Sequence, residues 1–440
     1  MDAHSEALSL FTQPGVNSGV ESTYYVQHLP INQVGGGNFI EFSVQSPDFI
    51  DLSRSTMCIK AKVVCGDDTD IKKITGDADY DKAGDVVPTN LLIYSLFDKV
   101  DFSIQHQSLS SDIPSHTFPY KMMLDTLLTE TKDENIPLLY VKDLSKALNA
   151  CSPWKALDTN PDNAKGNTAL KTRYKVITKS REFEMEGKLG IDFCDQKRYL
   201  LNNCTLSIRF WQSQPAFSLL SASTDVNHKI KITDFKLKLC HVKLSPELVL
   251  AINESCKLQP ISYPYQKSVI RTHSIAKGSQ SATINDLFSD KCPDKILVVL
   301  TSAKNYIGSY DTNPFFFDSY KLNEIGFYLD NYPLPGKPMT LKFDDNAYES
   351  DYVEAYRRLR EYSPQDFNIS FTDFARGYTI LAFDFSNGET GDLERNERRG
   401  QTRLEMRFAE ALNESVNVIV YGKFNSCLTI DQARNATLAK

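Results

Sequence analysis

Short runs of alternating apolar and polar residues recur along nearly the whole chain, and they restrict it to folds built from β-strands. In residues 56–64, Ile59 and Ala61 fall on one side of an extended backbone, while Lys60 and Lys62 fall on the other. A period of two gives one buried and one solvated face, as in antiparallel sheets. The abundance of Phe (25) and Tyr (21) also favours strands. The same pattern predicts strands at residues 39–44, 100–104, 183–193, 205–211, 230–240, 295–301, 324–329, 378–385, 403–408 and 416–424.

Helical patterns are few and short. Residues 120–130 and 352–361 each place their apolar side chains on one stripe. Ser245 followed by Pro246 is typical of a capped helix start and predicts a brief helix through Leu250. No regular helix of a dozen residues separates successive strands, so a parallel sheet with crossover helices is disfavoured. Two packed antiparallel sheets fit the pattern better.

An internal repeat suggests that one β domain is duplicated. In each half, a strand pattern is followed by a short helix that starts near a tyrosine, and each half closes with a similar pair of segments. We predict an all-β fold of two tandem eight-stranded jelly-roll sandwiches, a double jelly roll, with short helices in the loops. The matched segments are 96–104 with 320–329, the helices at Tyr120 and Tyr352, and 190–193 plus 201–210 with 382–385 plus 412–421.

Composition shifts suggest where the units begin and end. Residues 1–38, which contain Pro14 and a glycine run, are predicted to form an N-terminal arm. The first jelly roll is expected at 39–211 and the second at 228–440. The Ser-rich segment 212–227 between them is the expected linker. Long loops are predicted at residues 66–89, 145–172 and 386–402.

Charge and cysteine usage narrow the class of protein. The chain has 440 residues, 41% of them hydrophobic, and a formal net charge of -7. It has enough apolar residues to form a core, and its net negative charge disfavours non-specific nucleic-acid binding over its whole surface. Neither a transmembrane span nor a signal peptide is predicted. Its nine cysteines stand singly, without a C-x-x-C pair, which indicates reduced thiols: 58, 65, 151, 194, 204, 240, 256, 292 and 427.

Two motifs resemble ligand loops but lack essential residues. The run from Gly35 to Gly37 could cradle a phosphate, yet no Gly-Lys-Ser/Thr follows, so a hinge is favoured. The acidic residues at positions 77, 79 and 81 begin like a calcium loop. Lys82 stands where that loop needs Gly, and Pro88 where it needs Glu. A solvated acidic loop is the better interpretation.

No residue pattern indicates catalysis. The seven histidines are isolated and form no H-E-x-x-H motif, although a three-histidine site assembled across strands, as in cupins, stays open. His241 is expected to be a core or edge residue of its strand. No serine lies in a G-x-S-x-G setting. We therefore assign no catalytic, cofactor-binding or metal-binding residue, expect no cofactor, and predict that the chain is not an enzyme.

Two clusters are candidates for contacts between subunits. The first is a basic group interleaved with glutamates, which predicts a salt-bridged loop or contact rather than a DNA-binding stripe. The second is the run Phe315–Phe317, either a loop folded onto the core or an aromatic anchor at a subunit interface. The basic residues are Arg395, Arg398, Arg399, Arg403 and Arg407.

The order of these strand patterns resembles the major capsid (hexon-type) proteins of Maverick/Polinton elements and adintoviruses, over about residues 17–434. The motifs are strand patterns rather than catalytic signatures, so their shared order carries the resemblance. In the first half they are 39–42 (FIEF), 50–53 (IDLS), 58–62 (CIKAK), 91–100, 118–121 (FPYK) and 126–128 (TLL). In the second half they are 308–315 (GSYDTNPF), 375–378 (ARGY), 383–385 (FDF), 404–409 (LEMRFA) and 416–421 (VNVIVY).

The resemblance implies a virion protein that forms homotrimers of pseudo-hexagonal outline and tiles an icosahedral shell, assembled inside the host cell. Its partners would be further copies of itself and a penton or minor capsid protein, without sequence-specific nucleic-acid binding. The N-terminal arm would lie under the shell and contact a neighbour or the penton base. Two alternatives stay open: a penton-type minor capsid protein with a single jelly roll, and a β-sandwich or cupin-like sugar-binding protein.

Overall fold

The computed structural model describes most of the chain. The described residues are 19–34, 37–71, 86–110, 116–129, 168–221, 227–288, 291–341, 350–362, 369–374, 377–385 and 398–438.

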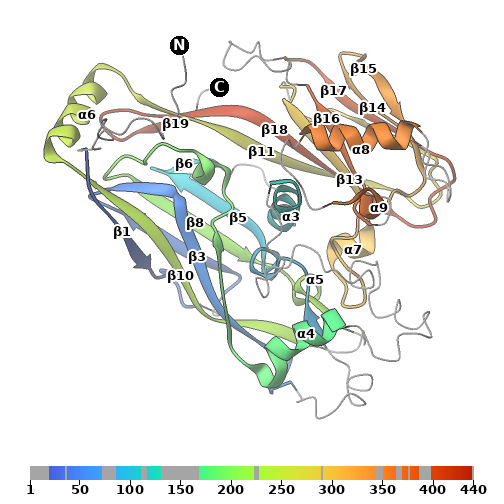
Figure 1. Cartoon of the computed structure of the whole chain (residues 1–440), viewed down its shortest axis with the longest axis horizontal. Coiled ribbons are helices and arrows are strands. Elements are labelled where there is room, and N and C mark those ends of the chain that lie inside the picture. Colours follow the sequence, from blue (N-terminus) through green and yellow to red (C-terminus); the bar gives the residue numbers. More distant parts are fainter. Residues whose placement is uncertain are drawn as a thin grey trace, which may run out of the picture.

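The described strands form four main antiparallel sheets, which make two sandwiches side by side (Figure 1). Sheet 1 has the order β1 (Val20–His28), β10 (His228–Leu244), β3 (Phe49–Cys65), β7 (Phe183–Lys188). Sheet 2 has the order β2 (Phe39–Gln45), β8 (Thr205–Gln212), β5 (Phe97–Ile104), β6 (Gln107–Ser108). Sheet 3 has the order β11 (Ile261–Ile275), β18 (Val416–Ile430), β13 (Lys295–Ser302), β16 (Ile380–Asp384), with β19 (Ala436–Leu438) also on β18. Sheet 4 has the order β12 (Ser281–Asn285), β17 (Thr402–Phe408), β14 (Leu322–Leu329), β15 (Tyr332–Thr340).

The two sandwiches have the same topology. If the eight main strands of each unit are numbered along the chain, one sheet reads 1-8-3-6 and the other 2-7-4-5 in both units. This is a jelly-roll arrangement, so the fold is a double jelly roll and the duplication predicted from sequence is confirmed. A small two-stranded sheet, β4 (Val86–Pro88) with β9 (Leu219–Ser221), lies outside this pattern.

The alternating sequence pattern produces the sandwich cores. In β8, Leu206, Ile208 and Phe210 are buried and alternate with less buried residues. Phe210 pairs with Val100 on the neighbouring strand β5, which places their side chains on one face. Across the sandwich, the ring of Phe235 on sheet 1 contacts that of Phe210 at 5.0 Å between centroids. Aromatic contacts of this kind join the two sheets into one core.

Short helices fill the connections. Figure 1 shows α3 between the strands of the two units and α6 at one end of the molecule. No helix in the described part of the chain is long and apolar enough to cross a membrane. The helices are α2 (Leu92–Ser95), α3 (Thr117–Thr129), α4 (Thr168–Ile177), α5 (Pro215–Ser218), α6 (Pro246–Leu258), α7 (Ala303–Ile307), α8 (Ser350–Tyr362) and α9 (Phe371–Phe374), with 3-10 turns η3 (Thr178–Ser180) and η4 (Asp192–Asp195).

The N-terminal arm and the linker predicted from sequence need correction. Strand β1, expected in the arm, pairs with β10 from Val20 opposite Leu244 to His28 opposite Leu237. Strand β10, expected to open the second unit, also pairs with β3 of the first. It is therefore the eighth strand of the first jelly roll. We propose revised boundaries, with the first unit running from β1 to Leu244, α6 as the connector, and the second unit starting at Ile261.

The first block of the predicted repeat is confirmed, and the second block is wrong. Strands β5 and β14 are both the fourth strand of their unit, and α3 and α8 each follow the fifth. The segment at 201–210 contains β8, a seventh strand, whereas 412–421 contains β18, an eighth. The true partner of β8 is β17. Neighbouring strands with the same alternation are indistinguishable by pattern, which explains the error.

Most predicted strands are present, with one shortened. The pattern over residues 183–193 is a strand only to Lys188, after which the chain turns into η4. Ser245 accepts a hydrogen bond from the Leu248 backbone N–H, as a helix cap does, but α6 extends to Leu258 rather than ending near Leu250.

The described cysteines are free thiols, and no disulfide joins any two of them. Several lie in the core; Cys194 and Cys204, for example, are buried, and burial raises the pKa of both thiols. Adding a reducing agent should therefore leave the melting temperature of the purified protein unchanged, because no disulfide among these residues contributes to stability. Thermal denaturation with and without dithiothreitol checks this. A melting temperature that drops by several degrees in the reducing agent would show that a disulfide contributes to stability.

Candidate functional site

The junction between the two jelly rolls contains buried charged groups and aromatic rings from both units. Helix α3 of the first unit contacts both β5 of its own unit and β11 of the second. An aromatic cluster lies on one side of this helix and a network of charged groups on the other. This junction fixes how the two units stand relative to each other.

Tyr120 on α3 is the centre of the aromatic cluster. Its ring is stacked on Tyr306 of α7 at 5.5 Å and lies at 5.9 Å from Phe217 of α5. Phe315, in the second unit, contacts Tyr120 at 5.8 Å and Phe217 at 5.8 Å. The Tyr120 hydroxyl donates to the Pro314 carbonyl at 3.2 Å. Residues from both units therefore share one apolar core.

This cluster corrects one expectation for the run Phe315–Phe317. Phe315 and Phe317 are almost completely buried within the chain itself, at 1% and 0% exposure. They are consequently not available as anchors for a neighbouring subunit. The alternative, a loop folded onto the core, is confirmed, and the core in question joins the two units.

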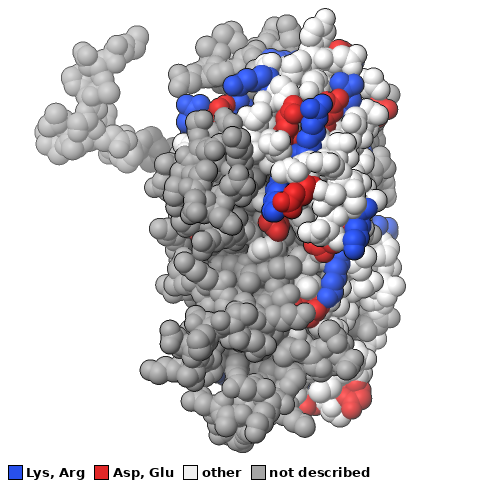
Figure 2. Space-filling view, turned by 90° about the vertical axis from the view of Figure 1, so that its right-hand side faces the viewer, with Lys and Arg blue, Asp and Glu red and all other residues white. Residues whose placement is uncertain are grey.

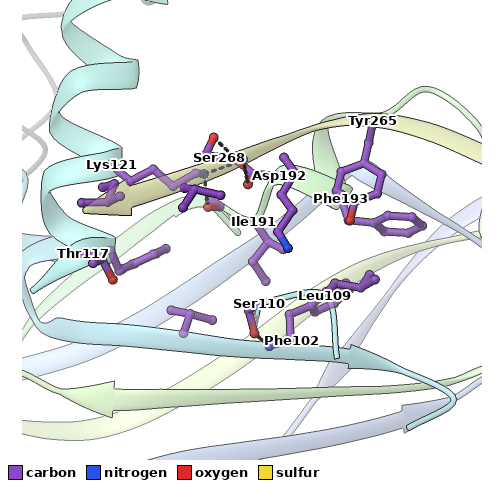
Figure 3. Close-up of a pocket in the computed structure, with 16 residues that line it drawn as sticks. Phe102, Leu109, Ser110, Thr117, Lys121, Ile191, Asp192, Phe193, Tyr265 and Ser268 are labelled. Carbon is purple, nitrogen blue, oxygen red and sulfur yellow. Dashed lines mark hydrogen bonds and ion pairs between the residues drawn. The ribbon is translucent and has the colours of Figure 1, made fainter. Parts of the chain in front are cut away.

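Lys121 on α3 anchors the charged network. Its Nζ lies 3.0 Å from Asp192 Oδ1 on η4 and 3.7 Å from Asp125 Oδ2 one helical turn away, and donates to the Gly190 carbonyl at 2.7 Å. Burial alone favours the neutral amine, but the two carboxylates outweigh it and raise the pKa of Lys121 above its ordinary value. Figure 3 shows Lys121 approaching Asp192 and Ser268.

Strands of the second unit complete the network. Asp125 accepts a hydrogen bond of 2.8 Å from the Tyr421 hydroxyl and lies 3.3 Å from Lys423 Nζ, both on β18. Asp192 accepts from the Ser268 backbone N–H on β11 at 2.7 Å. Burial favours the neutral acid at Asp125, but Lys423, Lys121 and the Tyr421 hydroxyl hold the pKa of that carboxyl below its ordinary value. The network therefore joins the units through ionised groups.

Asp195 lies close to this network and behaves differently. Burial raises the pKa of its carboxyl, an effect that Asp125 and Asp192 reinforce and Lys121 opposes. The site thus contains carboxyls whose pKa values are shifted in opposite directions. Sequence analysis identified α3 only by its apolar stripe. The pair Lys121 and Asp125 at i and i+4 was the available signal for an ion pair, but its partners on β11 and β18 lie far away in sequence.

The arginine cluster forms part of a salt-bridged sheet face. Arg403 Nε lies 3.1 Å from Glu405 and its guanidinium lies over the Tyr328 ring at 5.0 Å. Arg407 lies 3.5 Å from Glu324 on β14. Figure 2 shows basic and acidic side chains interleaved on the side of the molecule where β14 and β15 lie. Arg398 is the first described residue of this segment and Arg399 follows it, whereas Arg395 lies outside the described residues.

The other candidate residues are not brought together. Gly35, Gly36 and the acidic run 77–81 lie outside the described residues. Within the described ranges, no group of three or more His, Cys, Asp or Glu side chains is placed to hold a metal ion. His241 is buried, with its Nδ1 2.9 Å from Ser46 Oγ and its Nε2 3.3 Å from His28 Nε2. Burial lowers the pKa of both histidines.

Strand β1 and the turn after it expose apolar side chains at an edge of sheet 1. The exposed fractions of Tyr25, Leu29 and Ile31 are 53%, 65% and 66%. Among the described strands β1 pairs only with β10, so no described strand covers its other edge. Exposed apolar residues beside an open strand edge are typical of a contact surface.

Comparisons of the sequence with known proteins give one relative of uncharacterized function. No family model matches the chain. A Caenorhabditis elegans protein, uncharacterized protein F54H12.2, is 28% identical over 267 residues, which cover 57% of this chain. The matched region spans 62% of the length of that relative.

Solved structures match over almost the full chain. A chain in the cryo-EM structure of the Sputnik virophage has a TM-score of 0.64 and 12% identity, covering 100% of this chain and 92% of that one. A chain of the PBCV-1 virus capsid has a TM-score of 0.57 and 11% identity, with coverages of 98% and 99%. The mavirus major capsid protein has a TM-score of 0.54 and 10% identity, with coverages of 100% and 96%. At these identities the likeness establishes a shared fold, the double jelly roll of viral capsid proteins.

Proposed function

We propose that this chain is a major capsid protein that associates into homotrimers of pseudo-hexagonal outline and tiles an icosahedral virion shell. The observation that carries the proposal is the pair of sandwiches with identical strand order, matched over the whole chain by capsid proteins. Three chains with two like units each would present six similar units around one axis, so a trimer fits a six-fold lattice position.

The proposal includes finer points that the resemblance suggests. The chain would belong with the capsid proteins of Maverick/Polinton elements and adintoviruses, assemble inside the host cell, and meet a penton or minor capsid protein at the five-fold positions. A penton-type role for the chain itself is disfavoured, because such proteins have a single jelly roll and this chain has two. No observation favours a sugar-binding role.

The oligomeric state tests the proposal directly. Mass photometry of the purified protein should show a particle of three 49.7-kDa chains that persists on dilution to nanomolar concentration. An obligate contact of this kind usually buries more than about 2,000 Å² with an apolar centre. A protein that stays monomeric at micromolar concentration in analytical ultracentrifugation would contradict the proposed trimer.

The exposed edge beside β1 is our candidate for part of the trimer contact. The double substitution Leu29→Lys and Ile31→Lys places two cations in that contact and should weaken the trimer at least about 100-fold. Both side chains are exposed in the single chain, so its melting temperature as a monomer should change little. Leu258→Lys, at an 89% exposed site at the end of α6, is the matched control and should leave the trimer intact. If the double variant assembles like the parent protein, this edge lies outside the contact.

A further inference from the structure

A cavity lies at the junction of the two jelly rolls. Its volume is about 80 Å³, enough for several water molecules or a short apolar chain. The first unit contributes residues of β5, α3 and η4 to its wall, and the second contributes one stretch of β11. Figure 3 shows Phe102 and Leu109 on one side of this space and Ser268 and Tyr265 across it. A molecule bound here would touch both units.

The wall is mostly apolar. Phe102, Ile191, Phe193 and Ile270 are among the lining residues, and all but Ile191 are buried. Phe193 meets Tyr265 edge-on at 5.4 Å. An apolar wall with a few convergent polar groups is the usual composition of a small-molecule site.

Two polar groups on β11 have few or no partners in the described structure. The hydroxyl of Tyr265 is buried and makes no hydrogen bond of normal geometry there. Burial raises the pKa of this hydroxyl, and Ser426 on the paired strand β18 lowers it by a smaller amount. Lys267 lines the same cavity, and its ammonium group has no ion pair or hydrogen bond among the described residues. A buried hydroxyl without a full set of partners is unfavourable, so a ligand that supplies an acceptor would stabilise the protein.

The charges that line the cavity favour an anion. Lys121 and Asp192 line it too, but they are paired with each other at 3.0 Å and are further bonded to Gly190 and Ser268. This leaves Lys267 as the uncompensated charge among the lining residues. A single carboxylate could accept from both the Lys267 ammonium and the Tyr265 hydroxyl, while an attached aliphatic chain contacts the aromatic wall.

We propose that this cavity is a binding site for a small aliphatic carboxylate, with its head group at Lys267 and Tyr265 and its chain between the two jelly rolls. The size of the cavity suits a chain of about four to six carbons. Because the bound molecule would contact both units, it would stabilise the native protein in proportion to its occupancy. The inference does not depend on the proposed capsid role.

The test is a titration of the purified protein, in the oligomeric state in which it is isolated, with 6-fluorohexanoate observed by ¹⁹F NMR. Saturable binding with a dissociation constant between about 10 μM and a few millimolar is expected for a ligand of this size. The alcohol 6-fluorohexanol has the same chain without the charge and should bind at least about tenfold more weakly. Equal binding of acid and alcohol, or no saturable binding of the acid at 20 mM, would overturn the proposal.

Two substitutions locate the site. Lys267→Met removes the ammonium group and leaves an apolar side chain of similar length. It should raise the dissociation constant about tenfold or more. Tyr265→Phe removes only the hydroxyl and should raise it about threefold to tenfold. Neither change removes a hydrogen bond of normal geometry to the described residues, so both variants should keep the melting temperature of the unliganded protein. Lys257→Met, at an exposed ion pair on α6, is the control and should bind like the parent. Unchanged affinity in Lys267→Met would place any bound acid elsewhere.

The result can be separated from the proposed function. Binding of the acid to a protein that proves monomeric would support the cavity and contradict only the trimer. A stable trimer that does not bind the acid would support the trimer and contradict the proposed binding site.

Discussion

Replacing Tyr120 with alanine is expected to destabilise the protein by about 3–5 kcal/mol, the range for removing a large aromatic side chain from a core. Tyr120 is fully buried and its ring contacts residues of both units, including Phe217 and Phe315. The surrounding rings belong to separate elements and cannot collapse fully into the space left behind. Urea denaturation followed by tyrosine fluorescence and circular dichroism would measure the shift of the unfolding midpoint.

Matched variants separate the contributions of the ring and the hydroxyl. Tyr120→Phe keeps the ring and loses only the hydrogen bond to Pro314, so a loss of about 1 kcal/mol is expected. Tyr332→Ala removes a tyrosine that is 76% exposed and should change stability by less than about 0.5 kcal/mol. If Tyr120→Ala cost no more than Tyr332→Ala, the junction would not depend on the aromatic cluster.

Replacing Lys121 with methionine should be nearly as damaging at neutral pH, with a loss of about 3 kcal/mol. The substitution keeps the length of the side chain but leaves Asp192 and Asp125 without their shared cation in a poorly solvated site. Removing one partner of a buried ion pair is costly because the remaining charge is uncompensated. The exposed pair Lys257 and Glu254 offers the control, since Lys257→Met should cost less than about 1 kcal/mol.

The pH dependence of this loss distinguishes charge from packing. In the folded protein the pKa of Asp125 is below its ordinary value of 3.8, so its ionised form contributes stability that is full above pH 3.8 and disappears as the pH falls through the folded pKa. Asp195, whose pKa burial raises, destabilises the fold when ionised, and Lys121 moderates that effect. The stabilisation that Lys121 provides to ionised Asp125 and to ionised Asp195 therefore disappears when these carboxyls are protonated.

The difference between the parent protein and Lys121→Met should accordingly be large at pH 7 and shrink below about pH 4. Toward alkaline pH the parent protein stays more stable than the variant beyond the ordinary pKa of lysine, 10.5, because the pKa of Lys121 is raised in the folded protein. This difference in stability is lost only as the pH passes that raised pKa. Unfolding midpoints at pH 3.5, 5 and 7 measure this trend. A difference that is independent of pH would mean that the side chain acts through packing alone.

The strands could be predicted from sequence because their cause is local. Alternation of buried and exposed residues is set by successive side chains pointing to opposite faces, so Thr205–Gln212 is recognisable within its own eight residues. Strand β1 was missed for the same reason. Its pattern is almost entirely exposed, because it covers the edge of sheet 1 rather than facing a core on one side. A strand without a buried face has no alternating pattern, so its sequence resembles that of an arm.

The candidate site could not be predicted in the same way. The sequence drew attention to glycine, acidic and arginine clusters, where residues of one kind are neighbours in the chain, and assigned no ligand or catalytic site to any of them. The structure instead joins Lys121, through Asp192 and Asp125, to residues of β11 and β18 that follow it by more than a hundred positions. It also places Tyr265 and Lys267 in a cavity with η4. Nothing in the local pattern of β11 distinguishes its junction-facing residues from those of an ordinary strand.

The amino-acid sequence alone determined that this chain forms antiparallel sheets and that its halves repeat, because the periodicity and order of its segments express those properties directly. Only the tertiary structure decided which strand closes each jelly roll, where one unit ends, and what holds the two together. Those features depend on pairings such as Tyr24 with His241 and on buried contacts between distant segments. The free energy of such contacts arises from burial and from charges brought together by folding, which no stretch of the chain carries by itself.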